Sequence, residues 1–226
     1  MDFTVQSLGF KMRLRNKPWT ESFLKENQWW LLPVIVKEPL NLEKIYANKN
    51  PIHLEIGCGK GGFITNLASQ NKNINFVAME KETTVIGVAV KKSLTTNPDL
   101  KNLRFLNSYA EKLEEYFSTN SVERIYLNFS DPWPKSRHAK KRLTFTTFLN
   151  IYKNILVDGG EIHIKTDNDK LYEFTLEMVE LNQWKLVSNT NDLYNDKNLL
   201  KNNIPTEYET KFHNLGKNIN KIIIKK

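Results

Sequence analysis

Short apolar runs along the chain alternate with segments in which apolar residues recur at helical spacing. The runs predict buried strands in five places: 52–56, 75–79, 103–106, 124–129 and 161–165. After the first run, Phe63, Ile64, Leu67 and Ala68 recur as they do on one face of a helix. Short strands that alternate with helices are typical of a parallel sheet covered on both faces. We therefore expect a single-domain α/β protein with a doubly wound, mostly parallel, Rossmann-like sheet.

The second half of the chain continues this alternation. Helical patterns occupy 82–94, 110–117, 145–155 and 171–178. We expect Asp158-Gly159-Gly160 to terminate the third of these helices, because glycine commonly follows a helix end. A strand at 184–188 and a final antiparallel strand at 217–226 bring the predicted sheet to seven strands. The polar, Asn-rich stretch 189–203 shows no period from which its structure could be predicted.

Residues 1–32 show no clean period and combine basic with aromatic side chains. Cations precede Pro18 and Trp19, at Lys11, Arg13, Arg15 and Lys17. We expect a partly flexible basic arm over 1–32, followed by one domain over 33–226. Because Met12 directly precedes the basic cluster, residues 1–11 are interpreted as an extension before the functional start. A disordered polar tail is an equally favoured alternative for the arm.

Composition narrows the class of protein. The 226 residues are 40% hydrophobic and 26% charged, as in soluble globular proteins. No run approaches the roughly 18 apolar residues that a membrane span needs, and no secretory signal is visible, so we expect a cytoplasmic protein. The single cysteine, Cys58, excludes an internal disulfide, and four scattered histidines give no metal-ligand spacing. No metal is expected, and Cys58 is interpreted as a packing residue.

Positive charge suggests a polyanionic partner. The net charge is +8, and its densest cluster contains no acidic residue: Lys135, Arg137, Lys140, Lys141 and Arg142. We call residues 135–142 the basic segment. The alternative interpretation is a solvated helix face that binds nothing.

The stretch just before the basic segment predicts a rigid turn. The strand at 124–129 runs into Ser130-Asp131-Pro132-Trp133-Pro134. Pro132 cannot donate a hydrogen bond to a sheet, and Pro134 restricts the backbone of Trp133. The turn should therefore present an acid and an indole at the end of the strand. A turn that merely joins a strand to a helix is the alternative.

A glycine-rich loop follows the first predicted strand. Gly57-Cys58-Gly59-Lys60-Gly61-Gly62 lies between a strand and a helix, as in nucleotide-binding βαβ units. Glu80 ends the next strand about 20 residues further on, where an acid accepts hydrogen bonds from ribose hydroxyls. The loop alone fits a dinucleotide or S-adenosylmethionine. Carboxylates at Glu55 and Asp131 would repel a pyrophosphate and attract a sulfonium and an ammonium, which favours S-adenosylmethionine.

Four segments together resemble the bacterial tRNA (guanine-N7-)-methyltransferase family: 54–61, 128–142, Lys165-Thr166-Asp167-Asn168 and 206–212. The resemblance extends from about Arg13 to the C-terminus. It implies a class I methyltransferase that uses S-adenosylmethionine to methylate N7 of a guanine in tRNA, at position 46 of the variable loop. The cofactor residues so implied are Glu55, Glu80 and Asp131, together with the loop glycines Gly57, Gly59 and Gly61. Asp131 is also the implied catalytic residue, and the implied substrate residues are Lys135, Asp167, Thr206 and Glu209.

One position departs from the family pattern. Much of the family has an acid after the third strand, where adenine is held, but this chain has Asn107-Ser108-Tyr109. We expect stacking on Tyr109, or a backbone amide, to replace that contact.

The implied reaction suits the available side chains. Guanine N7 is an unprotonated lone pair, so no general base is required, and catalysis depends on alignment and electrostatics. Asp131 and Asp167 would stabilise the purine charge or hold the guanine edge, Lys135 would reach O6 or a phosphate, and Arg137, Lys140, Lys141 and Arg142 would contact tRNA phosphates.

Three alternatives remain open on sequence alone. An exocyclic-amine methyltransferase would carry two adjacent prolines where Trp133 separates Pro132 from Pro134. The others are an NAD-dependent oxidoreductase and a noncatalytic RNA-binding protein. A monomer and a homodimer are both compatible with the sequence, and no obligate protein partner is expected.

Overall fold

The computed structural model describes residues 17–226, whose strands form one seven-stranded sheet in the order β3-β2-β1-β4-β5-β7-β6. The strands are β1 (Ile52–Ile56), β2 (Asn75–Glu80), β3 (Leu103–Asn107), β4 (Val122–Asn128), β5 (Leu156–Thr166), β6 (Lys185–Thr190) and β7 (Asn220–Lys225). β1 to β5 pair in parallel, and β7 is antiparallel to both of its neighbours, β5 and β6. The predicted sheet and its antiparallel C-terminal strand are confirmed.

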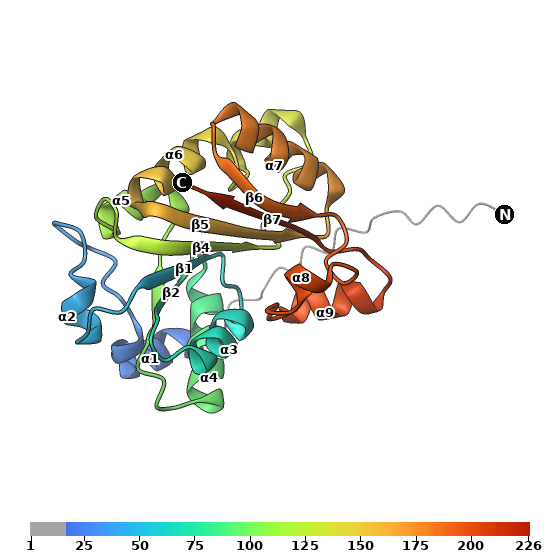
Figure 1. Ribbon diagram of the computed structural model, residues 1–226. Helices are drawn as coiled ribbons and strands as arrows, with labels where there is room; N and C mark the ends of the chain where they lie inside the picture. Colours follow the sequence, from blue (N-terminus) through green and yellow to red (C-terminus); the bar gives the residue numbers. More distant parts are fainter. Residues whose placement is uncertain (1–16) are drawn as a thin grey trace.

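Helices cover both faces of the sheet (Figure 1). α5 (Leu113–Tyr116), α6 (Thr146–Ile155) and α7 (Asp169–Leu181) lie on one face, while α1 (Trp19–Glu26), α3 (Gly62–Gln70) and α4 (Thr83–Thr96) lie on the other. Each face has its own core. Leu54 and Ile125 point into the first with Phe148 of α6, and Phe76 and Phe105 point into the second. This arrangement is the predicted doubly wound architecture.

The parallel register brings the candidate residues to one edge. Ile56 pairs with Met79, and Asn128 pairs with Lys165, so β1, β2, β4 and β5 end side by side. The glycine loop, the turn after β4 and Asp167 therefore leave the sheet at its carboxyl edge, where ligands bind in open α/β sheets.

The region after α6 differs from the sequence-based prediction. α6 ends at Ile155 and β5 begins at the next residue, so Asp158-Gly159-Gly160 lies inside a strand and does not terminate the helix. The pairing of β5 with β4 shifts in register between Val122 and Arg124. Gly159, with a φ of 76°, lies in the part of β5 that this irregularity spans. Glycine at this point therefore supports a bulge, which is its other common use in strands.

The Asn-rich stretch contains regular structure that its sequence pattern does not reveal. β6 extends to Thr190, and α8 (Lys197–Leu200) is capped by Asp196, whose side chain accepts hydrogen bonds from the amides of Asn198 and Leu199. α9 (Glu207–Asn214) follows, and Figure 1 shows both helices at one end of the sheet. They return the chain to the carboxyl edge before β7.

The described part of the N-terminal region packs on the domain. Trp30, at the end of the 3₁₀ helix η1 (Gln28–Trp30), is buried with its ring centroid 6.4 Å from that of Phe105, and the amide of Leu32 donates to the carbonyl of Phe105. The predicted cluster Lys11, Arg13 and Arg15 and the alternative start at Met12 lie outside the described residues. The remaining elements are α2 (Leu42–Tyr46) and the 3₁₀ helices η2 (Ala110–Lys112) and η3 (Ser136–Lys141). Within residues 17–226, no helix is long and apolar enough to span a membrane.

Candidate active site at the carboxyl edge of the sheet

The glycine loop forms a tight connection from β1 to α3. The amides of Gly57 and Cys58 both donate to the carbonyl of Met79, at 2.8 and 3.0 Å. Gly61 caps α3 with a φ of 75°, and a Cβ there would lie 3.0 Å from the Cβ of Ala89. At Gly57 and Gly59, in contrast, an added Cβ would meet no atom within 4 Å. The loop therefore packs tightly on α4 at one end and leaves open space above its backbone at the other.

Glu80 braces this loop. One carboxylate oxygen accepts a hydrogen bond from the amide of Gly59 at 3.3 Å, and the other accepts from the amides of Lys81 and Glu82, at 2.9 and 3.2 Å. The residue predicted to bind the ribose thus contacts the glycine loop directly.

Glu55 is a buried acid with an unused oxygen. It is 2% exposed, and its Oε1 accepts a hydrogen bond from Asn128 Nδ2 at 2.9 Å. Among the described residues, its Oε2 has no hydrogen-bond partner. Burial raises the pKa of Glu55 to about 8, although the hydrogen bond from Asn128 and the charge of Lys165 lower it. An orphaned, buried carboxyl group of this kind calls for a cationic or hydrogen-bonding ligand.

The turn after β4 is strained and tightly held. Phe129 and Trp133 both have left-handed backbones, with φ of 52° and 42°, which bulky residues rarely adopt. Arg142 holds the turn closed, because its Nε donates to the carbonyl of Pro132 at 3.0 Å and its Nη2 to that of Trp133 at 3.1 Å. Asp131, between the two strained residues, is exposed. The predicted rigid turn presenting an acid is therefore present in the structure.

The cations of the basic segment differ in their surroundings. Arg142 is half-buried, with its guanidinium 4.2 Å from the ring centroid of Phe174, so its charge is used within the protein. Lys141 is exposed, and its Nζ lies 4.7 Å from the ring centroid of Trp133. The other cations of the basic segment are also exposed: Lys135, Arg137 and Lys140. Four of the five cations thus face solvent beside the strained turn.

Asp167, directly after β5, shares its environment with a tyrosine. Burial raises the pKa of the Asp167 carboxyl group, although a hydrogen bond from the Tyr208 side chain lowers it. Tyr208 is 43% exposed, and its ring lies 5.0 Å from that of Phe129 and stacks at 4.2 Å on that of Phe212. Tyr208 therefore links α9 to the ends of both β4 and β5.

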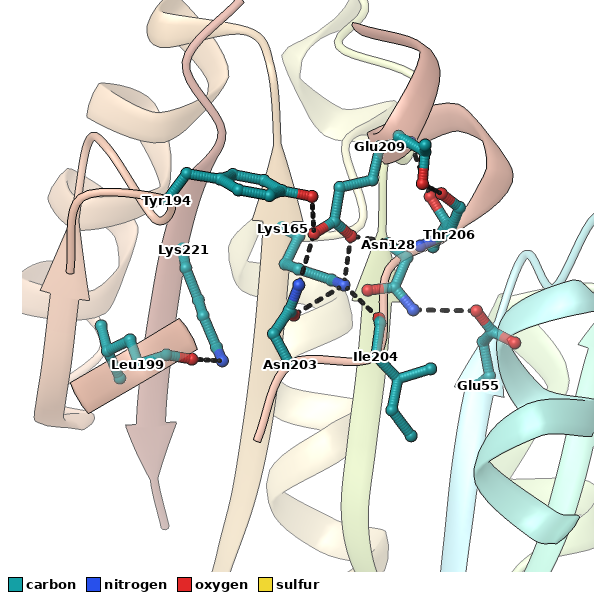
Figure 2. Close-up of polar contacts among 11 residues, drawn as sticks. Glu55, Asn128, Lys165, Tyr194, Leu199, Asn203, Ile204, Thr206, Glu209 and Lys221 are labelled. Atoms are coloured by element: carbon teal, nitrogen blue, oxygen red, sulfur yellow. Dashed lines mark hydrogen bonds and ion pairs between the residues drawn. The ribbon is translucent and has the colours of Figure 1, made fainter. Parts of the chain in front are cut away.

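Thr206 and Glu209 form a capping box at the start of α9. Thr206 Oγ1 accepts a hydrogen bond from the amide of Glu209 at 2.9 Å, and the Glu209 carboxylate accepts from the amide of Thr206 at 3.2 Å. Glu209 is fully buried, and Figure 2 shows its carboxylate directed at Lys165, Asn203 and Tyr194. Of these two implied substrate residues, Glu209 points into the protein in this structure.

Asn107, the last residue of β3, and Tyr109, just after the strand, have different surroundings. Asn107 donates to the carbonyls of Glu80 and Lys81 and accepts a hydrogen bond from Thr83, so its side chain is committed to the turn after β2. Tyr109 is 56% exposed. The exposed Tyr109 ring therefore offers a surface on which a ligand could stack.

Comparisons with known proteins bear on this arrangement. A family model described as a putative methyltransferase matches residues 49–222. A tRNA (guanine-N(7)-)-methyltransferase of Mesoplasma florum is 55% identical over 221 residues, covering 95% of this chain and 99% of that protein. One of Brevibacillus brevis is 45% identical, covering 93% and 97%. This chain belongs to the tRNA (guanine-N(7)-)-methyltransferase family.

The fold of this tRNA (guanine-N(7)-)-methyltransferase family member is similar to that of a solved methyltransferase structure. The crystal structure of the 16S rRNA methyltransferase KamB matches with a TM-score of 0.60 at 15% identity, covering 86% of this chain and 97% of that one. The sequence-based resemblance and the Rossmann-like class I fold are thereby confirmed. The predicted donor, S-adenosylmethionine, is confirmed by the methyltransferase family together with matching methyltransferase structures that contain S-adenosyl-L-methionine or S-adenosylhomocysteine. The site also fits this donor, because the orphaned oxygen of Glu55 and the open space at Gly57 and Gly59 would receive a cationic ligand.

Three residues of the methyltransferase site are not predicted from the sequence: Asn128, Lys165 and Tyr208. Each lies in one of the four segments that carry the family resemblance, and each follows or ends a strand, or begins a helix, at the carboxyl edge. That combination of motif and position is the signal that could have identified them.

Proposed function

We propose that this protein transfers the methyl group of S-adenosylmethionine to N7 of a guanine in tRNA, at position 46 of the variable loop. The observation that carries the proposal is the half-satisfied, buried Glu55 beside an open glycine loop, at the same sheet edge as Asp131 and the basic segment. The high identity to relatives with this name supports the choice of substrate.

The cofactor would be held by the ends of β1 to β3. Glu55 offers a carboxylate to its positive charge, Glu80 faces the loop where a ribose would lie, and Tyr109 offers an exposed ring to adenine. S-adenosylmethionine supplies a methyl group on a sulfonium, which makes that carbon electrophilic. The open backbone at Gly57 and Gly59 admits the ligand without steric conflict.

The target base would be positioned by the turns after β4 and β5. N7 attacks with its own lone pair, so the protein needs to supply alignment and charge, and no proton has to be removed from the nucleophile. Asp131 is held by the strained turn, and Asp167 by its contact with Tyr208. These two carboxylates, with Lys135 nearby, would orient the guanine and stabilise the positive charge that develops on it.

The tRNA backbone would follow the exposed cations of the basic segment. Arg137, Lys140 and Lys141 face solvent beside the turn and would neutralise phosphates without reading sequence. Arg142 contributes indirectly, because it holds the turn that carries Asp131.

A nucleobase analogue tests the acceptor atom. Transcribed tRNA carrying 7-deazaguanosine at the target position replaces N7 by C–H and keeps the Watson–Crick edge. It should bind like ordinary tRNA and accept no labelled methyl group from S-adenosylmethionine. Ordinary tRNA, with the modified base mapped by mass spectrometry, serves as the positive control.

Other outcomes would identify the rival functions. Methylation of the deaza-substituted tRNA near the ordinary rate would refute N7 as the acceptor and favour the exocyclic-amine reaction. Tight tRNA binding with no methyl transfer to either tRNA would favour a noncatalytic RNA-binding protein.

A further inference from the structure

Lys165 is a buried cation near the end of β5, and the hydrogen bonds of its ammonium group all reach one segment of the chain, residues 203–209. It is 4% exposed, and its Nζ donates to Glu209 Oε2 at 2.5 Å, to Asn203 Oδ1 at 3.2 Å and to the carbonyl of Ile204 at 3.0 Å (Figure 2). A lysine ammonium has three N–H donors, so all three are satisfied by residues 203–209. One of these directional bonds is to Glu209 within α9 and two are to the residues that lead into it, so together they fix the position and rotation of the start of α9.

The same lysine adjoins the cofactor half of the site. Its Nζ lies 5.2 Å from the ring centroid of Phe63 in α3, the helix that follows the glycine loop. In the sheet, Lys165 pairs with Asn128, and Asn128 donates to Glu55. Figure 2 shows Glu55, Asn128, Lys165 and Glu209 next to one another across the carboxyl edge.

The helix that Lys165 holds carries the substrate-side contacts. Tyr208, next to Glu209, meets Asp167 and Phe129. A second ion pair, between Glu207 and Lys92 of α4, is largely exposed, and such pairs contribute little. Among the ion pairs of the described residues, the Lys165–Glu209 pair is therefore the buried anchor of α9.

We propose that Lys165 is a positioning residue: through Glu209 it fixes α9 so that Tyr208 and Asp167 present one defined surface to the target base. Lys165 itself does not contact the base. This role rests on the proposed function, and it differs from a direct substrate contact by Glu209, whose carboxylate is buried against Lys165. Two apolar side chains could pack here with similar area, but they would not fix the rotation of the helix as three hydrogen bonds do.

The test compares Lys165→Met with the double variant Lys165→Met/Glu209→Gln. The single change leaves a buried carboxylate without its partner, so it should lower the melting temperature, whereas the double variant has no unpaired charge and should regain stability. Misplacement of a bound base by about 1 Å commonly lowers a rate about 100-fold, and we expect a loss of that size in kcat for both variants. The Kd for tRNA should stay within about threefold of wild type, because the phosphate contacts are untouched. The Kd for S-adenosylmethionine should weaken far less than kcat falls, and only because loss of the Lys165 charge raises the pKa of Glu55 further.

Lys221→Met is the matched control. Lys221 is 8% exposed, pairs with Lys165 across β5 and β7, and donates to the carbonyl of Leu199 in α8. It donates no hydrogen bond to α9, although its charge also acts on Glu209, so its removal should leave kcat close to the wild-type value. Amide hydrogen exchange over 206–214 in the free protein should be faster in the double variant than in wild type or in Lys221→Met.

Several results would overturn the proposal. Recovery of kcat together with stability in the double variant would make the pair merely structural, as would equal loss in Lys221→Met. A Kd for S-adenosylmethionine that weakens as much as kcat falls would assign Lys165 to the cofactor site. If the wild-type protein itself fails to methylate tRNA, the proposed function is refuted. The exchange experiment then still decides whether Lys165 holds α9, because equal exchange rates in wild type and the double variant would refute that role.

Discussion

Cofactor affinity should rise steeply with pH, because Glu55 must lose a proton to meet a cationic ligand. Burial raises the pKa of Glu55 to about 8 in the free protein, so at pH 6 about 1% of the molecules carry the carboxylate and at pH 8 about half do. If the bound ligand brings the pKa well below 6, the Kd at pH 6 should be about 50-fold weaker than at pH 8, or about 2.3 kcal/mol. Above pH 8 the affinity should rise by no more than about another twofold and then level off.

Glu55→Gln provides the control that isolates this effect. The amide fills the same space and cannot titrate, while the ligand's own amino group titrates identically with both proteins. The difference between the two pH profiles therefore reports Glu55 alone. Binding of S-adenosylmethionine would be measured by calorimetry from pH 6 to 9, in buffers of different ionisation enthalpy, so that proton release is counted directly.

The expected result is release of close to one proton by wild type at pH 7 beyond that released by Glu55→Gln. Parallel pH profiles for the two proteins, or equal proton release, would refute the assignment of Glu55 to the positive charge of the cofactor. A Kd in Glu55→Gln as tight as that of wild type at pH 8 would do the same.

Three further predictions concern stability and RNA binding. Because the pKa of Glu55 rises from 4.5 to about 8 on folding, the native state holds a proton that the unfolded state releases between these pH values. The free energy of unfolding should therefore fall as pH rises from 5 to 8, by up to about 1.4 kcal/mol per pH unit. Urea unfolding of Glu55→Gln should lack this pH-dependent component. Alanine at all three of Arg137, Lys140 and Lys141 should reduce the slope of log Kd for tRNA against log salt concentration by about 0.7 to 0.9 per lost phosphate contact. Arg142→Ala, in contrast, should lower turnover and leave this slope unchanged. An unchanged slope in the triple variant would place the RNA path elsewhere. Gly61→Ala should lower the melting temperature, because it combines a left-handed backbone with a Cβ 3.0 Å from that of Ala89. Gly57→Ala adds only the backbone strain, so it should mainly weaken cofactor binding as measured by calorimetry.

The fold was predictable because its strands and helices carry strong local patterns. The structure of β1 to β5 and of the glycine loop can be predicted from a few residues of each segment. The parallel topology then follows because these strands alternate with helices. Gly159 was not predictable in the same way, since glycine is used both after helices and in bulges. Only the pairing of β5 with β4 distinguishes these uses.

The candidate site was predictable as a set of residues, but not in the direction of its side chains. The sequence shows that Arg142 and Glu209 are charged, but it does not show their partners. Arg142 donates hydrogen bonds to the carbonyls of Pro132 and Trp133, and Glu209 accepts one from Lys165. Tyr208 escaped prediction for the same reason, because its contact with Asp167 joins residues from distant parts of the chain. Long-range polar contacts are set by tertiary packing, on which local periods carry no information.

The left-handed backbones of Phe129 and Trp133 have a consequence for protein engineering. Each conformation costs on the order of 1–3 kcal/mol, so glycine or asparagine at these positions would relieve strain that the folded protein now bears. A selection for thermostability alone would therefore favour replacing them. Such variants would free the segment on either side of Asp131 and lose the aromatic neighbours of Tyr208 and Lys141, so gains in melting temperature there should be accompanied by slower turnover.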